Sequence, residues 1–324
     1  MRKQILPLDP ANYPRHRIHG ADRNWVETNC YVDVWVELLH AWGFEPIAAL
    51  PFTLAIDFEG DQWTFFKFAI ADLYDLYGLD VQELAIWRPL GHHVEEQVAL
   101  GRPVLVELDS YYLPDTAGTA YQRAHVKTTV AINDIDLVNR RLGYFHGASF
   151  YHLQDADFAS LFHVQDAKDV VRMPPYVEFV KRADIAPPRG SDLLTASLQI
   201  LRRQLRRLPR ANPFGMFKAR LENDLSWLAQ GTMETFHQYS FATLRQFGAA
   251  FELAATYLHW LQQHNVKDLA QPIAAYQALS IGAKAMQFQL ARTMTRKKPL
   301  DLAVLDQMAS QWQTAVTSLQ TSFL

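Results

Sequence analysis

The feature of this sequence that most limits its fold is a change of pattern at residues 186–191 (APPRGS), a short segment rich in proline and glycine. Before it, short runs of β-branched and aromatic residues alternate with helical stretches. After it, apolar residues recur at helical spacing and strand-like runs are almost absent. Because such a segment is typical of a turn or linker, the sequence predicts two domains, residues 1–185 and residues 186–324.

The first domain is expected to be α+β. Helices are expected at residues 30–42 and 92–100, each followed by glycine. Strands are expected at residues 103–108, 126–132, 142–145 and 149–153, with turns at Asn133-Asp134 and at Gly147. Since the helices come first and the strands follow one another closely, an antiparallel sheet is the natural arrangement.

The second domain is expected to be all-α. Apolar residues at helical spacing predict five helices, near residues 191–209, 213–230, 233–264, 268–293 and 299–322. No apolar run in the chain approaches the ~18 to 20 residues that would span a membrane. The first 20 residues also lack the apolar stretch of a secretory signal, so we expect a cytoplasmic protein.

The chain contains one cysteine, Cys30, which excludes an intramolecular disulfide framework and a cysteine-rich zinc site. Asn29 is a favourable N-cap, so Cys30 is expected to be the first residue of an amphipathic helix. The positive end of the helix dipole favours the thiolate, the form that acts as a nucleophile. The alternative is an inert thiol packed at the helix start.

A downstream histidine bears on this choice. His125 directly precedes the strand expected at residues 126–132. A helix-start cysteine followed about a hundred residues later by a strand-start histidine is how papain-like folds bring a thiol and an imidazole together. The imidazole takes the thiol proton and then donates it to the leaving group. Taken alone, His125 is better explained as a half-exposed strand residue.

The segment 101–114 (GRPVLVELDSYYLP), which leads through Tyr121 to His125, resembles the N-terminal domain of the butirosin-biosynthesis acyltransferase family. That family has a papain-like fold and moves an aminoacyl group from a carrier-protein thioester to an amine acceptor. Three further motifs, ETNCY at 27–31, DFEGDQWTFFK at 57–67 and LPDT at 113–116, resemble an uncharacterised bacterial domain-of-unknown-function family, the one numbered 1839. Its members are often encoded near amino-acid:carrier-protein ligases. The resemblance covers about residues 20–165.

The resemblance implies a catalytic role for Cys30 as the nucleophile and for His125 as the base. Papain-like domains usually place aspartate or asparagine at the end of the return strand, where this chain has His146. His146 is therefore the implied orienting residue, and Asp134 and Asp136 are alternatives.

Other residues are candidates for binding the substrate. Asn24, six residues before Cys30, matches the side-chain amide donor of an oxyanion hole, or is an ordinary loop residue that caps a turn. An aminoacyl substrate carries an ammonium group that needs a carboxylate. Asp109 is the first candidate and Asp115 the second, although Asp115 fits a turn-forming aspartate somewhat better. Tyr121 is the third expected substrate-binding residue.

Two pairs of histidines raise the question of a metal site. His16 and His19 have no Cys, Asp or Glu close enough in the sequence to complete a local ligand set, so we expect solvated loop residues. His92 and His93 are adjacent and fit exposed residues at a helix start. We expect no metal and no cofactor beyond a phosphopantetheine-linked substrate. The acidic, aromatic segment 57–64 fits a packed structural loop better than a substrate-facing one.

Charge is distributed unevenly along the chain. Residues 1–183 hold 16 Lys and Arg against 25 Asp and Glu, whereas residues 184–324 hold 15 against 9. The densest basic stretch is predicted to place two rows of arginine on one helix face: Arg202, Arg203, Arg206 and Arg207. Such a face is usually only solvated, but it can also dock an acidic acyl carrier protein. The pI of about 6.5 argues against a nucleic-acid partner.

The sequence thus predicts a papain-like α+β domain followed by a helical domain. The expected activity is transfer of an aminoacyl group from a carrier-protein thioester through Cys30 to an amine acceptor. Two alternatives remain open: a cysteine hydrolase, either peptidase or thioesterase, at the same site, and a catalytically inactive papain-like binding protein.

Overall fold

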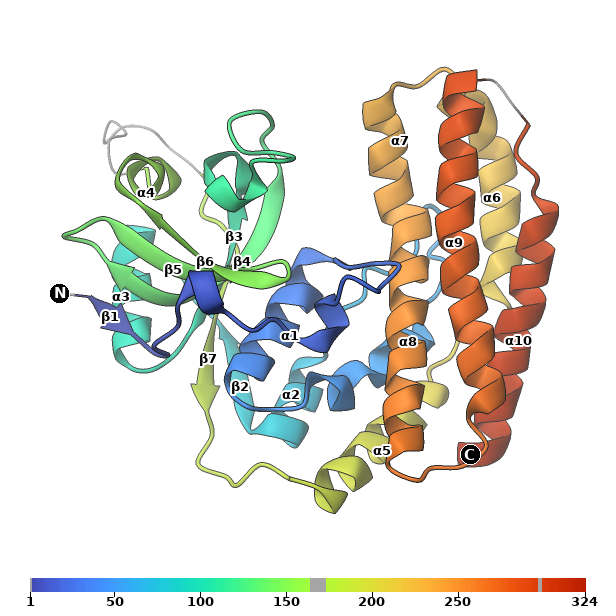
Figure 1. Cartoon of the computed structure of the whole chain (residues 1–324), viewed down its shortest axis with the longest axis horizontal. Helices are drawn as coiled ribbons and strands as arrows, with labels where there is room; N and C mark the ends of the chain where they lie inside the picture. Colours follow the sequence, from blue (N-terminus) through green and yellow to red (C-terminus); the bar gives the residue numbers. More distant parts are fainter. Residues whose placement is uncertain (1, 164–172, 297–298) are drawn as a thin grey trace. The chain divides into compact units, whose positions relative to one another are not determined.

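The structure of the protein is a computed structural model that describes residues 2–163, 173–296 and 299–324 (Figure 1). The chain forms two compact units. The first consists of residues 1–20, 29–46 and 73–187, and the second of residues 21–28, 47–72 and 188–324. The units therefore divide near the proline- and glycine-rich segment. Two stretches that precede it by more than a hundred residues, 21–28 and 47–72, nevertheless belong to the helical unit.

The first unit is built on an antiparallel sheet, for which the described residues supply seven strands. The strand order is β2-β7-β3-β4-β5-β6, and β1 pairs with the far end of β4. The strands are β1 (Lys3–Gln4), β2 (Leu79–Glu83), β3 (Val104–Asp109), β4 (Lys127–Asp136), β5 (Arg141–His146), β6 (Ser149–Gln154) and β7 (Val177–Arg182). The four strands expected from the sequence are present, and with the helical second unit they confirm the α+β class.

The expected turn at Asn133-Asp134 is wrong, because β4 continues to Asp136 through a shift of register between Ile132 and Asp134. The reason is that β1 and the residues directly after it pair with this end of β4. Asn133 exchanges two hydrogen bonds with the backbone of Leu6, at 3.0 and 2.9 Å, and these satisfy its polar side chain within the sheet. The expected turn at Gly147 is confirmed, since Gly147 takes the positive φ of 50° between β5 and β6.

Helices cover both faces of this sheet. Helix α1 (Cys30–Ala41) packs on one face, against β4, β5 and β6. Helices α3 (Leu90–Ala99) and α4 (Asp155–Leu161) pack on the other face, where their apolar residues join one hydrophobic cluster with alternate residues of β3, β4 and β5. Helix α2 (Ile70–Tyr77) precedes β2. Because side chains alternate along a strand, each residue of β4 faces either α1 or the α3–α4 side.

The second unit is helical. Its α-helices are α5 (Ser191–Leu205), α6 (Pro213–Leu228), α7 (Met233–Ser240), α8 (Gln246–Gln263), α9 (Ala270–Arg296) and α10 (Ala303–Phe323). A π-helical segment, Phe241–Arg245, joins α7 to α8, so that the single helix expected at residues 233–264 is one continuous run with an irregular turn inside it. Helices α8, α9 and α10 lie side by side in sequence order (Figure 1).

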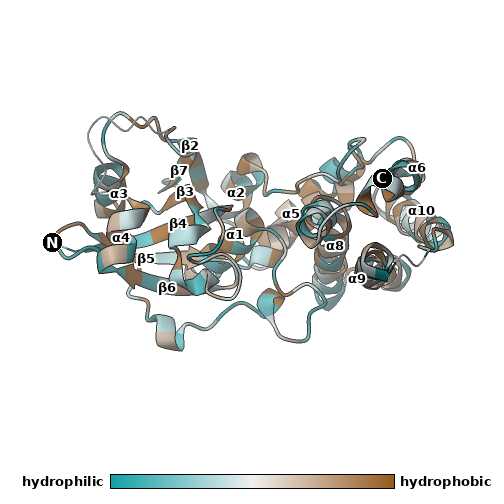
Figure 2. Ribbon diagram, turned by 90° about the horizontal axis from the view of Figure 1, so that it is seen from above, coloured by the Kyte–Doolittle hydropathy of each residue, from teal (hydrophilic) through white to brown (hydrophobic). Residues whose placement is uncertain are grey.

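Trp63 lies in the core of the helical unit. Its ring is completely buried, and Phe214, Phe217, Phe247 and Phe251 have ring centroids 4.9 to 6.2 Å from it. Within the segment 57–64, Phe58 and Trp63 are buried and residues 59–62 are exposed. Hydrophobic residues concentrate on the strands and on helix faces, whereas many connecting loops are hydrophilic (Figure 2). Among the helices of the described residues, none combines the length and apolarity needed to cross a membrane.

Candidate functional site

Cys30 is the first residue of α1, as the sequence predicted. The side chain of Asn29 accepts a hydrogen bond from the backbone N–H of Val32 at 3.0 Å, and Asn29 itself is extended. The residue is partly exposed, and its Sγ donates to Oγ1 of Thr129 at 3.6 Å. Within the described residues, no histidine nitrogen lies at hydrogen-bond distance from this thiol.

His125 forms a dyad with Asp109. The imidazole Nδ1 lies 2.6 Å from Oδ2 of Asp109, the last residue of β3. The ring of Tyr111 stacks on the imidazole with centroids 4.3 Å apart, and the His125 side chain is 67% exposed. Because Asp109 occupies Nδ1, Nε2 is the nitrogen that faces a ligand or solvent. Asp109, which we expected to bind a substrate ammonium group, is therefore the partner of the imidazole.

The structure does not bring this dyad to the thiol. Thr129, the partner of Cys30, pairs with Glu107 in the sheet, and Lys127 pairs with Asp109. His125 lies just before β4 and four residues before Thr129. At ~3.3 Å per residue, an extended segment separates these two positions by roughly 13 Å. The thiol and the dyad thus lie at separate points along the same two strands.

His146 belongs to a different cluster. Its Nδ1 lies 2.5 Å from Oδ2 of Asp115, and its Nε2 lies 2.8 Å from Oγ1 of Thr128. The hydroxyl of Tyr144 also donates to Asp115, and burial together with this carboxylate raises the pKa of Tyr144. Both ring nitrogens of His146 are occupied. His146 therefore does not orient His125, which uses Asp109 instead, and Asp115 is engaged within the protein.

The alternation of β4 explains this separation. Thr128 and Thr129 are consecutive strand residues, so their side chains point to opposite faces of the sheet. Thr129 faces α1 and Cys30, whereas Thr128 faces the side of His146 and Asp115. The cysteine and His146 are consequently on opposite faces.

The remaining expected residues also have structural partners. Asp134 is completely buried and lies 3.0 Å from Nε of Arg2, and Asp136 accepts hydrogen bonds from the turn that follows β4. The hydroxyl of Tyr121 donates to Asp157 at 2.9 Å. Asn24 belongs to the second unit, whereas Cys30 belongs to the first, and a role for Asn24 in an oxyanion hole stays a prediction.

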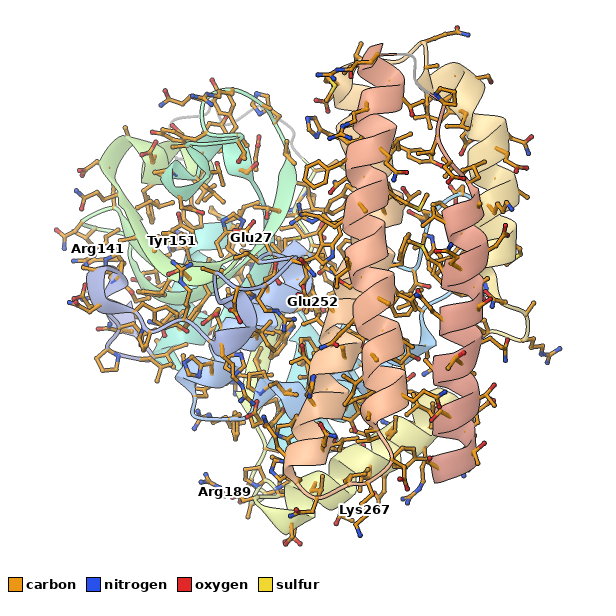
Figure 3. The ribbon with its side chains drawn as sticks, turned by 45° about the vertical axis from the view of Figure 1, so that its right-hand side comes forward. Glu27, Arg141, Tyr151, Arg189, Glu252 and Lys267 are labelled. Atoms are coloured by element: carbon orange, nitrogen blue, oxygen red, sulfur yellow. The ribbon has the colours of Figure 1, made fainter. Side chains whose placement is uncertain are left out.

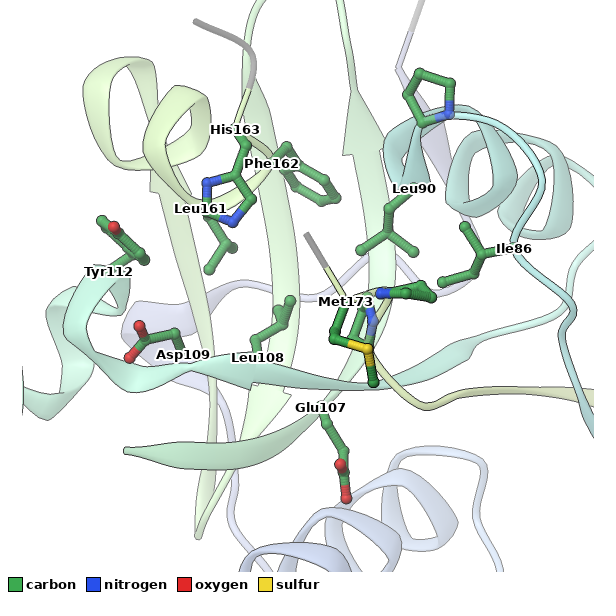
Figure 4. A pocket seen from close by; sticks show the side chains of 13 residues that line it. Ile86, Leu90, Glu107, Leu108, Asp109, Tyr112, Leu161, Phe162, His163 and Met173 are labelled. Carbon is green, nitrogen blue, oxygen red and sulfur yellow. The ribbon is translucent and has the colours of Figure 1, made fainter. Parts of the chain in front are cut away.

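Sequence reasoning missed the polar groups nearest to Thr129. Glu107 is its cross-strand partner, and Lys127 Nζ lies 2.9 Å from Oε1 of Glu107. Next to them, the hydroxyls of Tyr31 and Tyr176 each donate to the buried Glu178 at 2.9 Å. The signal was the alternation in VLVELD, which puts Glu107 on the face opposite to its apolar neighbours. Figure 4 shows Glu107 and Leu108 projecting from opposite sides of β3.

An apolar cavity of about 370 Å³ lies beside the dyad, on the α3–α4 face. Its walls come from β3, α3 and α4 and include Leu90, Leu108 and Phe162 (Figure 4). Asp109 and Tyr112 stand at one end of it. The dyad therefore has an apolar space next to it that can receive part of a ligand.

Comparison with known families identifies the chain. Residues 14–182 match the DUF1839 N-terminal domain, and residues 190–321 match the DUF1839 C-terminal domain. The chain belongs to the DUF1839 family. The two matches confirm the resemblance noted from the motifs and leave between them a short interval that includes the two prolines of the 186–191 segment. A search of curated proteins gives no match to the chain.

The first histidine pair of the DUF1839 protein is not solvated, contrary to expectation. His16 and His19 are 7% and 1% exposed. His19 Nδ1 lies 2.5 Å from Oε1 of Glu37 and Nε2 lies 3.2 Å from Oδ1 of Asp33, both on α1. Burial lowers the pKa of His19, but the hydrogen bonds and charges of these two carboxylates outweigh it and raise the pKa to about 9.

The second pair differs between its members. His92 is exposed as expected, but His93 is only 6% exposed, and its Nε2 accepts a hydrogen bond from the backbone of Trp87. Burial and the charge of Arg88 lower the pKa of His93. In the part of the chain that the structure describes, no group of three or more His, Cys, Asp and Glu side chains is arranged to hold a metal ion.

The basic stretch of the DUF1839 protein does not form two helical rows. Helix α5 ends at Leu205, so that Arg206 and Arg207 lie beyond its last turn. Arg203 is bound to the buried carboxylate of Asp72. Three of the four arginines, 202, 206 and 207, remain as an exposed basic surface without the regular spacing we expected.

Proposed function

We propose that this DUF1839 protein is a papain-like acyltransferase that moves an aminoacyl group from a carrier-protein thioester to an amine through Cys30. The observation that carries the proposal is the position of this thiol, partly exposed at the capped N-terminus of α1. Partial positive charge at a helix N-terminus favours a thiolate, and the hydroxyl of Thr129 can donate a hydrogen bond to it.

The first step forms an acyl-enzyme. The Cys30 sulfur attacks the thioester carbonyl, a new C–S bond forms, and the old C–S bond breaks. The phosphopantetheine thiolate leaves and takes up the proton that the cysteine lost, so the step needs no redox partner. We assign the backbone N–H of Cys30 to the oxyanion, because the N–H groups of Val32 and Asp33 already donate to Asn29.

The second step transfers the acyl group to the amine. The amine nitrogen attacks the acyl carbonyl, the C–S bond to Cys30 breaks, and the amine loses one proton. His125 accepts this proton through a chain of water molecules, because Asp109 holds Nδ1 and leaves Nε2 as the acceptor while the dyad lies away from the thiol along β4. The dyad therefore serves the acceptor amine rather than the thiol, consistent with its place further along β3 and β4.

Glu107 is the carboxylate we assign to the substrate ammonium group. It pairs with Thr129 in the sheet and lies on the face of the thiol, and its side chain is 29% exposed. Glu178 is less suitable because it is buried and already accepts two tyrosine hydroxyls. Lys127 holds Glu107 in position until the substrate arrives.

Intact-mass analysis after incubation with an aminoacyl carrier protein tests the first step. We expect an acyl adduct on the wild-type chain and none on Cys30→Ala. An adduct that persists in Cys30→Ala, or no adduct on the wild type, would sink the proposal. Adding candidate amines and analysing the products then separates acyl transfer from hydrolysis, because a hydrolase releases the free acid.

The dyad is tested in the same assay. Asp109→Asn should form the adduct normally but release it to the amine at least about tenfold more slowly, because the imidazole loses the partner that fixes its tautomer. Asp61→Asn, at an exposed carboxylate of the other unit, is the matched control and should match the wild type. Equal release by both variants would remove His125 and Asp109 from the mechanism.

A second candidate function is ligand binding without catalysis. It is favoured by one observation, the contact of the thiol with Thr129 rather than with a histidine. Iodoacetamide distinguishes the two, since a nucleophilic Cys30 reacts quickly at neutral pH and an inert thiol reacts slowly.

The exposed arginines are the surface we propose for docking an acidic carrier protein. The triple variant R202E/R206E/R207E should weaken carrier-protein binding, and the wild-type affinity should fall as salt increases. Arg203 is excluded from this test because it binds the buried Asp72. Unchanged affinity in the triple variant would place the docking surface elsewhere.

A further inference from the structure

The helical unit contains a second cavity, of about 420 Å³, that is distinct in composition from the apolar one. Its walls come from three stretches of that unit: the segment 24–27, the π-helical turn and helix α9. The lining residues are Asn24, Trp25, Val26, Glu27, Arg245, Lys284 and Gln287.

Two cations share this cavity. Lys284 Nζ lies 4.0 Å from the centroid of the Trp25 ring, and both Lys284 and Arg245 are half-buried. Within the described ranges, neither of them forms an ion pair with a carboxylate. Burial and then the charge of Arg245 lower the pKa of Lys284, while Glu252 acts in the opposite direction. Two half-buried like charges that lack a paired carboxylate are stabilised by an anion between them.

The carboxylates nearby do not neutralise the pair. Glu252 uses both oxygens on the backbone N–H groups of Asn24 and Trp25, at 2.9 Å each. Glu27 is exposed, and its backbone oxygen accepts from Nη2 of Arg245. Figure 3 marks Glu27 in the 21–28 segment and Glu252 on α8. The Glu252 carboxylate therefore holds a wall of the cavity, and Glu27 contributes its backbone oxygen to Arg245.

The walls are held by further hydrogen bonds. Trp25 Nε1 donates to Oγ of Ser280 at 3.1 Å, and Arg245 Nε donates to the backbone oxygen of Thr28 at 3.0 Å. Arg245 has five N–H donors, of which these backbone contacts use two. It is also the last residue of the π-helical turn, a conformation often found at functional sites. The donors are thus pre-positioned.

We propose that this cavity is a binding site for a phosphate group, with Lys284 and Arg245 supplying the charge and the amides of Asn24 and Gln287 supplying further hydrogen bonds. A guanidinium and an ammonium group together suit the tetrahedral phosphate oxygens. The phosphate can belong to a small phosphorylated metabolite or to a phosphopantetheine arm. The second source rests on the proposed acyl transfer, whereas the first does not.

Isothermal titration calorimetry on the full chain tests the site with three probes: inorganic phosphate, 4′-phosphopantetheine and pantetheine. Both phosphate compounds should bind and pantetheine should not. Lys284→Gln and Arg245→Gln should each weaken phosphate binding by about tenfold, since each removes one charge-assisted contact. Lys267→Gln is the matched control, because Lys267 lies in the exposed connection between α8 and α9, away from the cavity (Figure 3).

The affinities identify the source of the phosphate. Binding of 4′-phosphopantetheine at least tenfold tighter than inorganic phosphate assigns the site to the arm, and equal binding assigns it to a small phosphorylated ligand. Lack of binding of both compounds at millimolar concentration overturns the proposal. Wild-type affinity in both Lys284→Gln and Arg245→Gln, with thermal melting confirming that each is folded, also overturns it.

The phosphate site and the acyl transfer are tested separately. Cys30→Ala should keep the full affinity for inorganic phosphate, because the thiol is not among the cavity residues. Phosphate binding without an acyl adduct on the wild type leaves this proposal standing and removes the proposed function. An acyl adduct on the wild type without phosphate binding leaves the proposed function standing and removes the phosphate site.

Discussion

His19 gives the chain a measurable pH dependence. Its side chain is completely buried between Glu37 and Asp33 of helix α1, at 2.5 and 3.2 Å. These two carboxylates stabilise the imidazolium against the cost of burial and raise the pKa to about 9, from an ordinary value of 6.5. A difference of ~2.5 pKa units corresponds to about 3 kcal/mol of stabilisation in the charged state.

The sign follows from the direction of the shift. Because the pKa is higher in the folded than in the unfolded chain, the stabilisation is complete below pH 6.5 and disappears as the pH rises through 9. Between pH 6.5 and 9.5 the free energy of unfolding of the first unit should therefore fall by about 3 kcal/mol from this group. The loss loosens the contact between the N-terminal segment and α1, the helix that carries Cys30.

Hydrogen exchange of the α1 amides, followed by mass spectrometry from pH 6.0 to 9.5 and corrected for the intrinsic pH effect, isolates the first unit from the helical one. The α1 amides of the wild type should lose protection as the pH rises across this range. In His19→Gln they should already be less protected at pH 6 and should lose little further protection up to pH 9.5. His92→Gln, at an exposed histidine, is the control and should follow the wild type. Identical pH slopes in the wild type and His19→Gln would refute the reasoning.

Two further predictions concern packing and the thiol. Gly248→Ala puts a Cβ 2.6 Å from Cζ2 of the buried Trp25, so it should destabilise the helical unit by ~1–3 kcal/mol in urea denaturation; Gly282→Ala, whose Cβ meets the flexible end of Met308, should cost less. Equal urea midpoints for the two variants would show that the Trp25 ring moves aside as easily as the end of Met308. Thr129→Val removes the hydroxyl that contacts the thiol and should slow iodoacetamide alkylation by about threefold or more, since a hydrogen bond to the thiolate is lost. An unchanged alkylation rate would show that this contact has no part in the reactivity.

The elements that the sequence predicted well are those with local signals. Helix α1 begins at the expected Cys30, because the Asn29 cap and the periodicity that follows lie within a few residues. The five expected helical stretches of the second unit are present for the same reason, and Pro213 stands in the first turn of α6. Hairpins were predicted from the runs on either side of Gly147.

Strands β2 and β7 were missed because their signal is not local. Each carries charged residues, as in LDVQE and VEFVKR, and neither run is apolar enough to be read as a strand. Their pairing joins Leu79 to Arg182, across about a hundred residues, and is decided by the edge that β3 offers. The buried position of His19 has the same origin, because its two partners lie 14 and 18 residues later on α1.

The candidate site shows which contacts cannot be predicted from the order of residues along the chain. Residues 109–146 contain two carboxylate–imidazole pairs, His125 with Asp109 and His146 with Asp115. The sequence pointed to His146 as the partner of His125 and assigned Asp109 to the substrate ammonium group. Sheet register decides between them. The pairing of Asp109 with Lys127 puts the Asp109 carboxylate next to His125, two residues before Lys127. Alternation along β4 sends Thr128 and its partner His146 to the other face.

The same register also decides which side chains share a face of the sheet with Cys30. Since Cys30 contacts Thr129, the groups that share its face are the alternate residues of β4 and their neighbours on β3, which here are Lys127, Glu107 and Asp109. A shift of one residue in β4 would turn Thr128 rather than Thr129 toward the thiol, so the observed register decides which β4 side chains Cys30 can contact. In the register observed, the ion pair of Lys127 and Glu107 lies on the thiol's face of the sheet, whereas His146 lies on the other face. Substitutions at Glu107 and Lys127 should therefore affect acylation, whereas those at Asp109 should affect release.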